Sequence, residues 1–427
     1  MFERNTIFAL SSGRPPAGLG IVRVSGPDAR SAALALIGKV PPARQATLAA
    51  VHNAAGDLLD RAIILFFPAP ASATGEDCLE FHCHGGRAVL DAVLTALSEV
   101  EGLRPALAGE FTRRAFENGR IDLNEAEGLA DLLTAETESQ RRAAMAMAEG
   151  GLSALVARWQ VALLQLSAMI EAVLDFSDED DVPDAGIEND IVARLKALSD
   201  EVARELNRPR AERLKDGIRV VLAGPPNAGK STLINALAGR DAAIVSDIAG
   251  TTRDRIEVPC ALNGIAYLLI DTAGLREGGA DAIEQIGIAR AREAMDMADI
   301  ILWLGSPDDC PPNAICIAPK ADLGSVVDPR SIRLSVLLGE GLDDVMEAMD
   351  RRARALLPEE GAYAINVRQR AILSDLSAEL NAARAESDML LVAEHLRLGR
   401  LAMDRLTGRA GTEDMLDALF GTFCIGK

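Results

Sequence analysis

The chain has 427 residues, which at about 100–200 residues per domain predicts two to four domains. Hydrophobic residues make up 49% of it and charged residues 25%, a globular balance that excludes wholesale disorder and a collagen-like fibre. Acidic residues (64) outnumber Lys and Arg (44), giving a net charge of −20, so a general attraction to nucleic-acid phosphates is not expected. A local basic site is still compatible with this balance.

Cysteine usage and hydropathy indicate where the protein works. The six cysteines are dispersed without a Cys-x-x-Cys pair, which favours reduced thiols over a disulfide framework. The first ten residues contain no basic segment followed by a long apolar run, so no signal peptide is expected. Apolar runs are far shorter than the roughly 20 residues of a membrane span. We therefore expect a cytoplasmic protein with no membrane partner.

The first 120 residues alternate short apolar runs with glycine and proline turns. Residues 21–24 and 63–67 are predicted to be strands, and residues 88–97 a helix packed on them. This pattern indicates an α+β domain over residues 1–120.

Helical periodicity begins near Asn124 and becomes strongest over residues 152–173. Apolar residues recur there at steps of three and four, which marks one face of a long helix. The acidic run at 175–181 is interpreted as a solvated turn, with a metal or partner site as the lesser alternative. A further helix is predicted to end near Leu206.

Strands and helices alternate after a polar boundary at residues 207–217. Strands are predicted at 218–223, 300–304 and 315–318, with a hairpin turning at 263–264, the pattern of a doubly wound α/β sheet. Helical periodicity returns after Leu357, and Thr412 is predicted to cap a last helix. We therefore expect a multidomain α/β protein in which an α/β domain (215–357) is inserted into a helical domain (121–214 and 358–427).

A phosphate-binding motif opens the inserted domain. Residues 224–231 read GPPNAGKS and match G-x-x-x-x-G-K-[ST], between a predicted strand and a predicted helix. The glycines allow backbone N–H groups to surround phosphate oxygens, Lys230 is expected to reach the β- and γ-phosphates, and Ser231 is expected to bind Mg²⁺. Nucleotide binding follows.

Companion motifs identify the nucleotide as GTP. Asp271-Thr272-Ala273-Gly274 ends a predicted strand, and a hydroxyl-rich loop, GTTRD, occupies residues 250–254. Lys320-Ala321-Asp322 and Ser335 each follow an apolar strand. A carboxylate such as Asp322 accepts both N1–H and N2–H of guanine, whereas adenine offers no such pair. Together the motifs resemble a GTPase of the translation-factor type.

Two positions depart from the common GTPase pattern. Pro319 stands where Asn-Lys-x-Asp has asparagine, which predicts weaker guanine affinity with discrimination kept through Asp322. Leu275 stands where many GTPases have a water-orienting glutamine, and an apolar side chain cannot orient water. Glu284 is the candidate for that role, with a solvated helix charge as the alternative.

Several motifs over nearly the whole chain resemble the MnmE (TrmE) family of tRNA modification GTPases. They are the loop around Asn227, GTTRD, DTAGLR at 271–276, the C-terminal FCIGK at 423–427, and GED (75–77), HGG (84–86) and GEFT (109–112). The resemblance implies a folate-binding-like N-terminal domain, a helical domain and an inserted Ras-like P-loop GTPase domain. It also implies a homodimer whose GTPase domains meet across their active sites.

The resemblance assigns roles within the GTPase domain. Mg²⁺ would be held by Ser231 and Thr252, and K⁺ by Asn227 and the backbone of Ser246, Ile248 and Thr251. Glu284 and Lys230 would be catalytic. The GTP-binding residues would be Asn227, Ala228, Gly229, Lys230, Ser231, Thr232, Ser246, Asp247, Ile248, Ala249, Gly250, Thr251, Thr252, Asp271, Thr272, Ala273, Gly274, Lys320, Asp322 and Ser335.

The N-terminal domain resembles folate-binding domains, and the resemblance implies 5-formyl- or methylene-tetrahydrofolate as a cofactor. Arg23, Glu80, Arg120 and Lys427 would contact it, with the glutamate accepting pterin N–H groups and the cations meeting the folate carboxylates. Arg120 stands where lysine is common. Two alternatives concern neighbouring residues. The run 78–84 (CLEFHCH) could bind Zn²⁺, although the usual zinc spacing is absent, and Cys424 could be a reactive thiol or a packed side chain.

The implied function is potassium-activated hydrolysis of GTP to GDP and phosphate, coupled to modification of the wobble uridine (position 34) of certain tRNAs. With an FAD-dependent partner, MnmG (GidA), the family installs an aminomethyl or carboxymethylaminomethyl group at uridine C5. The runner-up is a ribosome-assembly GTPase that binds rRNA, for which no basic appendage is visible. A folate-dependent aminomethyltransferase without GTPase activity is disfavoured by the intact phosphate loop.

Overall fold

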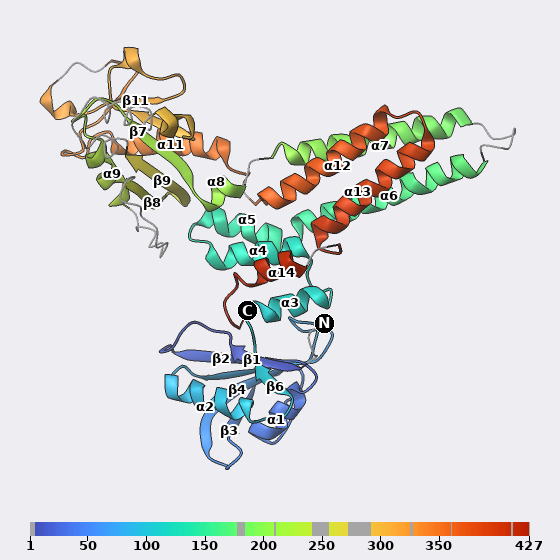
Figure 1. Cartoon of the computed structure of the whole chain (residues 1–427). Helices are drawn as coiled ribbons and strands as arrows, with labels where there is room; N and C mark the ends of the chain where they lie inside the picture. Colours follow the sequence, from blue (N-terminus) through green and yellow to red (C-terminus); the bar gives the residue numbers. More distant parts are fainter. Residues whose placement is uncertain are drawn as a thin grey trace. The chain divides into compact units, whose positions relative to one another are not determined.

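The computed structural model describes residues 5–176, 184–208, 211–240, 256–271, 292–324, 328–359, 361–410 and 413–426. Contacts divide the chain into two compact units. The terminal unit comprises residues 1–130 and 404–427, and the central unit comprises residues 131–403. The terminal unit therefore contains both ends of the chain, marked N and C in Figure 1.

A six-stranded sheet forms the centre of the terminal unit. Its order is β3-β4-β5-β2-β1-β6, and every pairing is antiparallel except that of β1 with β6. The strands are β1 (Thr6–Leu10), β2 (Leu19–Ser25), β3 (Thr47–His52), β4 (Leu58–Phe67), β5 (Cys78–His84) and β6 (Leu103–Pro105). The strands predicted at 21–24 and 63–67 are confirmed as parts of β2 and β4.

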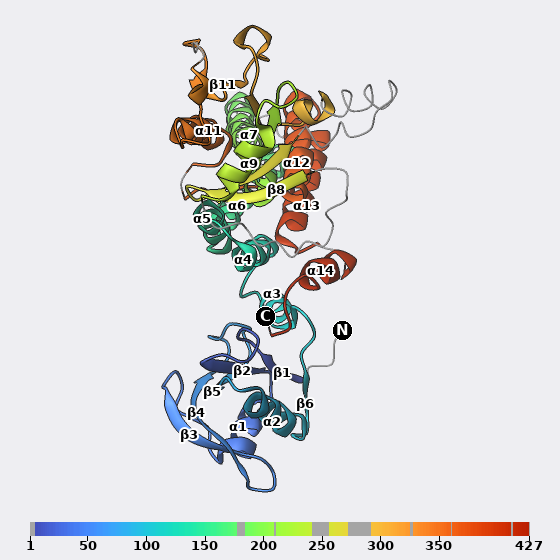
Figure 2. The same cartoon turned by 90° about the vertical axis from the view of Figure 1, so that its left-hand side faces the viewer.

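Helices cover both faces of this sheet. On one face α1 (Ala29–Ile37) and α2 (Arg87–Ser98) bury apolar side chains of alternate strand positions, and Figures 1 and 2 show both on the side away from α3. On the other face α3 (Glu110–Glu117) packs Phe111 against Ile7 and Ala9 of β1. The helix α4 (Leu123–Thr134) begins in this unit, and α14 (Glu413–Phe420) belongs to it.

The central unit contains a second six-stranded sheet with the order β12-β11-β10-β7-β9-β8. Its strands are parallel except β8, which forms a hairpin with β9 through a turn at Asn263 and Gly264, both of positive φ. The strands are β7 (Ile218–Ala223), β8 (Ile256–Leu262), β9 (Ile265–Asp271), β10 (Ile300–Trp303), β11 (Ile315–Ala318) and β12 (Ile332–Arg333). The doubly wound pattern and the hairpin are confirmed.

On one face of this second sheet pack α9 (Lys230–Ala238) and α11 (Leu342–Leu356), and on the other face the helical segment around Ala294 packs against Val221 and Ile270. The helices α9 and α11 share one apolar core with the strands, in which Leu233 of α9 and Val345 of α11 are fully buried. Short 3₁₀ turns at Pro307–Asp309 and Ala321–Leu323 follow β10 and β11. The core fixes the strand ends at which the nucleotide motifs lie.

The remaining helices of the central unit are α5 (Glu138–Ala148), α6 (Gly151–Phe176), α7 (Asp184–Leu206), α8 (Ala211–Lys215), α12 (Val367–Ala385) and α13 (Met389–Thr407), of which α13 ends in the terminal unit. The predicted apolar face of α6 is buried at Leu152, Val156, Trp159, Leu163, Leu166 and Ile170. α7 packs on both α6 and α12. Residues 177–183, which contain most of the acidic run, and Thr412, the predicted cap, are outside the described residues.

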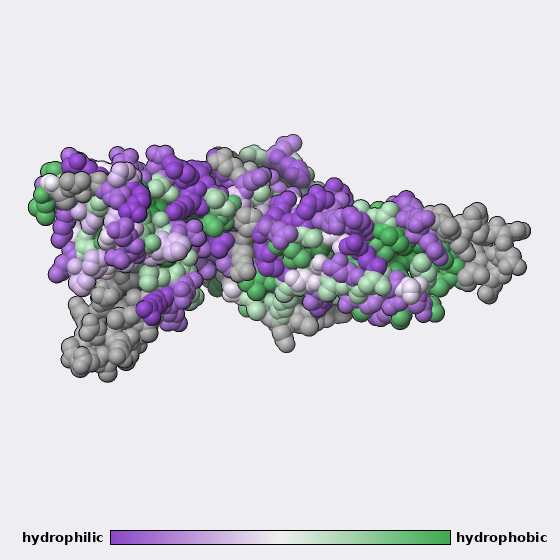
Figure 3. Space-filling model, turned by 90° about the horizontal axis from the view of Figure 1, so that it is seen from above, coloured by the Kyte–Doolittle hydropathy of each residue, from purple (hydrophilic) through white to green (hydrophobic). Residues whose placement is uncertain are grey.

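Within the described residues one helical stretch, Glu138–Asp175, is long and apolar enough to cross a bilayer by length and composition alone. A core helix of a soluble protein passes the same test, so one such helix is weak evidence. Its most apolar 18-residue window is 28% buried inside the structure, and the buried residues named above for α6 lie within the same stretch. Figure 3 shows a largely hydrophilic surface with hydrophobic patches over the helical part of the central unit.

One prediction about the cysteines is wrong. Cys310 and Cys316, which flank the turn between β10 and β11, form a disulfide, with Cα atoms 6.3 Å apart. The short loop between them brings the two residues together, and a scan for Cys-x-x-Cys could not detect this pairing. The other four are free thiols, of which Cys78, Cys83 and Cys260 are buried and Cys424 is exposed.

Candidate functional site

The phosphate loop joins the end of β7 to the start of α9. Gly224 has φ +144°, and a Cβ there would lie 2.7 Å from the carbonyl oxygen of Leu304, the residue after β10. Gly229, with φ +98°, precedes the first residue of α9. Gly224 is therefore required because the chain passes close to Leu304, and Gly229 because of its positive φ. The turn brings the N-terminal amides of α9, which favour an anion, to the sheet edge.

Lys230 is held inside this loop. Its side chain is 6% exposed, and its ammonium Nζ donates to the carbonyls of Gly224 (3.1 Å) and Pro225 (3.0 Å). The cation therefore lies over the turn that is shaped for a phosphate. Asn227, at the exposed tip, has φ +59°, and Thr232 is exposed in the first turn of α9.

Ser231 and Asp271 lie together beside the loop. The Ser231 hydroxyl donates to Asp271 Oδ2 at 2.6 Å, and Asp271 is 2% exposed at the end of β9. The parallel pairing of β7 with β9, which sets Leu222 opposite Asp271, brings the two side chains to the same sheet edge. A hydroxyl and a carboxylate are the hard oxygen donors that Mg²⁺ prefers, so the donor set fits that ion.

The predicted base-binding residues meet at the ends of β11 and β12. The buried Ser335 hydroxyl donates to Asp322 Oδ1 at 2.8 Å and orients that carboxylate. Lys320, with φ +59°, donates from Nζ to the carbonyl of Asn227 at 2.8 Å and so links this loop to the phosphate loop. Pro319 supplies no amide side chain beside them. The structure thus brings together the described nucleotide residues, although they are distant in sequence.

Several predicted nucleotide and metal residues lie outside the described ranges. They are Ser246, Asp247, Ile248, Ala249, Gly250, Thr251, Thr252, Thr272, Ala273, Gly274 and Glu284. Their roles therefore stay predictions.

A second predicted site lies on the sheet face that α3 partly covers. Arg23 of β2 and Glu80 of β5 are directly opposite in the strand register and form an ion pair at 2.9 Å. His82 contacts the other oxygen of Glu80 at 3.1 Å, and the Arg23 guanidinium lies 5.8 Å from the centre of the Phe111 ring. A partly exposed acid beside a partly exposed cation fits the chemistry expected for a pterin and a carboxylate.

The other predicted folate residues are placed by loops. Arg120 is exposed just beyond α3, and its Cγ would lie 3.2 Å from a Cβ on Gly75. The C-terminal segment reaches the same unit, because Ile425 forms a β-bridge with Ala108 and Gly426 packs closely on the carbonyl of Leu10. Lys427, the next residue, is outside the described residues.

The zinc alternative gains no support from the strand that carries it. Residues 78–84 form β5 with Glu80 and His82 on one face and Cys83 on the buried face. Burial, with a smaller effect of the Asp60 charge, raises the pKa of Cys83 to about 12, which disfavours a thiolate ligand. No cluster of three or more His, Cys, Asp or Glu side chains suited to a metal occurs in the described part of the chain.

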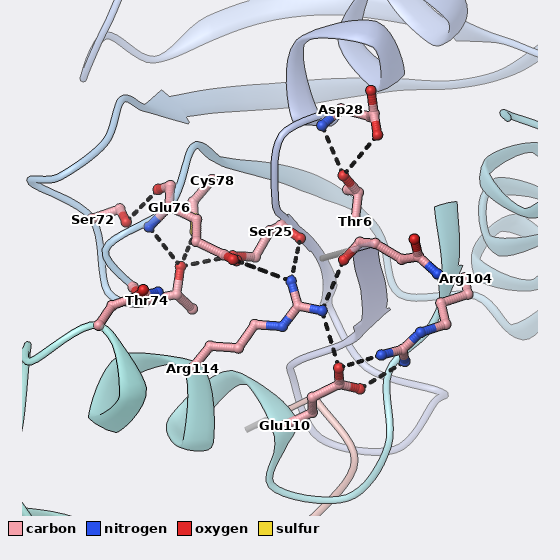
Figure 4. Close-up of polar contacts among 12 residues, drawn as sticks. Thr6, Ser25, Asp28, Ser72, Thr74, Glu76, Cys78, Arg104, Glu110 and Arg114 are labelled. Carbon is pink, nitrogen blue, oxygen red and sulfur yellow. Dashed lines mark hydrogen bonds and ion pairs between the residues drawn. The ribbon is translucent and has the colours of Figure 1, made fainter. Parts of the chain in front are cut away.

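Two arginines of α3 were not among the residues predicted from the sequence. Arg114 is buried in a polar network that includes Glu76 and Glu110, shown in Figure 4, and Arg113 contacts carboxylates of α14. Burial opposes ionisation of Glu110, but the hydrogen bond from Arg104, together with the Leu107 N–H and the charges of Arg104 and Arg114, holds its pKa below the ordinary value. The sequence feature that could have indicated a role for them is the pair of consecutive arginines in the short segment that forms α3.

Comparisons with known proteins agree with the motifs. A family model described as the GTP-binding protein TrmE N-terminus matches residues 6–120, and one described as the MnmE helical domain matches residues 123–424. A tRNA modification GTPase MnmE of Rhizorhabdus wittichii is 58% identical over 427 residues, covering 99% of this chain and 97% of that protein. The protein of that name in Erythrobacter litoralis is 55% identical, covering 99% and 100%.

Among solved structures, the G domain of the T. maritima FeoB iron transporter aligns at 24% identity over 32% of this chain and 98% of that one. Its TM-score of 0.24 is too low to bear on function. The family models and the full-length relatives are decisive: this chain belongs to the MnmE family of tRNA modification GTPases.

Proposed function

We propose that this protein hydrolyses GTP to GDP and phosphate and couples the hydrolysis to modification of the wobble uridine of certain tRNAs. The observation that carries the proposal is the convergence of three features at one sheet edge. These are the phosphate loop with buried Lys230, the Ser231–Asp271 pair, and the Asp322–Ser335 pair. The first would bind the phosphates, the second Mg²⁺ and the third guanine.

The residues divide the chemistry between them. Water attacks the γ-phosphorus, and the bond to the β–γ bridging oxygen breaks. Lys230 lies where its charge offsets negative charge on the β- and γ-phosphates, and the N-terminal amides of α9 add to it. Ser231 and Thr252 would hold Mg²⁺, which supplies further positive charge to the phosphates. Glu284 is assigned to orienting the attacking water.

Potassium is proposed to complete the site. Asn227, together with the backbone of Ser246, Ile248 and Thr251, would hold K⁺ against the phosphates. Bound K⁺ would supply the positive charge that an arginine finger provides elsewhere. Asn227 is exposed at the tip of the loop, so a second copy of the protein could approach the K⁺ held there. This accessibility supports a homodimer in which the second copy closes over the nucleotide.

The modification is proposed to use a folate and a second protein. Arg23, Glu80, Arg120 and Lys427 would bind 5-formyl- or methylene-tetrahydrofolate, the carbon source. An FAD-dependent MnmG (GidA) partner would join the reaction on tRNA in the cytoplasm. Cys424 is an exposed thiol, which favours the proposal of a reactive thiol over that of a packed side chain.

Hydrolysis of GTP in KCl and in NaCl tests the nucleotide half of the proposal, with Lys230→Ala as the control for contaminating activity. We expect hydrolysis that depends strongly on K⁺ and dimerisation of the protein with GTP and K⁺. Analysis of tRNA nucleosides in cells lacking the protein tests the other half. An unchanged wobble-uridine profile would contradict the modification and would favour the ribosome-assembly alternative.

A further inference from the structure

The two adjacent arginines of α3 make separate sets of contacts. Arg114, with a side chain 9% exposed, donates to Glu76 Oε2 at 3.1 Å and to Glu110 Oε1 at 3.1 Å. It also donates to the backbone carbonyls of Asn5 (2.8 Å) and Ser25 (3.4 Å). Figure 4 shows this guanidinium between the loop that carries Glu76 and the strand that ends at Ser25. A buried cation with this many partners fixes the positions of all of them.

The loop of residues 72–76 is fixed on the sheet by the same network. The Ser25 hydroxyl donates to Glu76 Oε2 at 2.7 Å and lies 2.7 Å from the Thr74 hydroxyl. Ser72 donates to the Glu76 carbonyl at 2.5 Å. Ser25 is paired with Cys78 in the β2–β5 register, two residues along from the Arg23–Glu80 pair and on the same face. The network therefore adjoins the predicted folate-binding ion pair.

The loop also places Arg120. Asn118 donates from Nδ2 to the Thr74 carbonyl at 2.8 Å, and Gly75 has φ +81°. A Cβ on Gly75 would lie 2.9 Å from the Asn118 Cβ and 3.2 Å from the Arg120 Cγ, so the Arg120 stem lies directly on the loop. A shift of residues 72–76 would move Arg120 relative to Arg23.

Arg113 fixes the C-terminal segment in the same way. Its guanidinium contacts Glu117 of α3 at 2.9 Å, Glu413 of α14 at 2.6 Å, and Asp417 of α14. Beyond them the rings of Phe420 and Phe423 join one apolar cluster with Phe116 of α3. The chain then continues to the Ala108–Ile425 bridge, one residue before Gly426. The attachment of α14 thus sets where the chain lies up to Gly426.

We propose that Arg114, through Glu76, and Arg113, through Glu413 and Asp417, are positioning residues of the folate site. Arg114 sets the spacing of Arg23 and Arg120, and Arg113 fixes the C-terminal segment up to Gly426, which precedes the predicted folate residue Lys427 in the sequence. Neither arginine contacts the ligand. This inference rests on the proposed folate binding. A ligand with a pterin at one end and carboxylates at the other requires cations at a fixed spacing, and second-layer contacts supply it.

The test uses two variants of the full-length protein that keep both arginines. Glu76→Gln preserves shape and removes the charge opposite Arg114, and Glu413→Gln/Asp417→Asn removes two exposed partners of Arg113. Arg30→Gln is the matched control, because it removes an ion pair of the same unit (Arg30–Asp77, 2.7 Å) whose arginine lies on α1, on the sheet face opposite α3. Thermal unfolding and GTP binding establish that each variant is folded.

Calorimetry with 5-formyl-tetrahydrofolate and with 5-formyl-tetrahydropteroate, which lacks the glutamate, gives the readout. We expect both variants to bind the folate about tenfold more weakly than the wild type, the pteroate to be less affected, and the control to be unchanged. Binding within twofold of the wild type, or equal losses for both ligands, overturns the positioning role. If the wild type binds no 5-formyl-tetrahydrofolate, the folate site itself is wrong, a separate and distinguishable failure.

Discussion

The hydroxyl of Ser231 lies 2.6 Å from Oδ2 of Asp271, so the first turn of α9 is joined to the end of β9 by one hydrogen bond. The two residues are 40 positions apart, and the parallel β7–β9 pairing brings them together. Because Asp271 is almost fully buried, its carboxylate has a fixed direction toward Ser231. We interpret the pair as the place where Mg²⁺ meets the protein.

Replacing Asp271 with asparagine tests this interpretation. Asn keeps the size of the side chain but removes the negative charge that favours Mg²⁺, so we expect GTP hydrolysis to slow by about a hundredfold. The Mg²⁺ concentration needed for half-maximal hydrolysis should rise, which titration at fixed GTP measures. Asp322→Asn is the control, because it should weaken guanine binding without changing the Mg²⁺ requirement. An unaltered Mg²⁺ titration for Asp271→Asn would refute the assignment.

Glu284→Ala should separate binding from hydrolysis. A residue that orients the attacking water contributes only in the transition state, so the variant should hydrolyse GTP about a hundredfold more slowly while binding it normally. Single-turnover hydrolysis and fluorescent-nucleotide titration measure the two quantities. A variant of the neighbouring Gln285, Gln285→Ala, serves as the control. Normal turnover in Glu284→Ala would identify Glu284 as a solvated helix charge.

Pro319→Asn should strengthen guanine-nucleotide binding. The new amide side chain restores a hydrogen-bonding group beside Lys320 and Asp322, and one or two added hydrogen bonds give about a tenfold gain in affinity. Titration with GDP and with an inosine analogue lacking N2–H₂ measures it. Pro319→Ala, which adds no hydrogen-bonding group, should not reproduce the gain. Equal affinities for Asn and Ala would mean that this position does not reach the nucleotide.

Glu110 should make the free energy of unfolding depend on pH in the acid range. Its folded-state pKa is lowered from 4.5 by the surrounding arginines, so the unfolded chain binds its proton more readily. This contribution is therefore complete above the ordinary pKa and is lost as pH falls through the lowered one. We expect Glu110→Gln to reduce the free energy of unfolding at pH 7 by about 3 kcal/mol, with the difference shrinking below about pH 4. Urea unfolding from pH 3 to pH 7 measures it, and a constant difference would contradict the assignment.

The burial and pairing of the cysteines predict how many thiols react in the native, denatured and reduced protein, which a thiol-labelling assay measures. In the native protein Cys424 alone is exposed among the four free thiols, and burial raises the pKa of Cys83 and of Cys260 to about 12. We expect one fast-reacting thiol in the native state, four in denaturant, and all six after reduction. Cys424→Ser should abolish the fast reaction. Six thiols in denaturant without reductant would mean that Cys310 and Cys316 are reduced.

Local patterns accounted for much of the fold. The apolar alternation and helical spacing correctly indicated β2, β4, β7, the β8–β9 hairpin and α6, because each pattern arises from burial of one face of one element. The phosphate loop was also readable, since its glycines, lysine and serine follow one another. The disulfide was missed because nothing in a pair of cysteines six residues apart distinguishes a bonded pair from two reduced thiols.

The sequence by itself determined the elements, the GTP motif and the family, since these depend on short-range order along the chain. Only the tertiary structure decided which distant residues meet: Arg113 reaches Asp417, 304 positions away, and Arg114 reaches Glu76, 38 positions away. An arginine in a helix carries no local sign of the carboxylate it will face, because that partner is chosen by how strands and helices pack. The second layer around the predicted folate site is therefore a property of the fold.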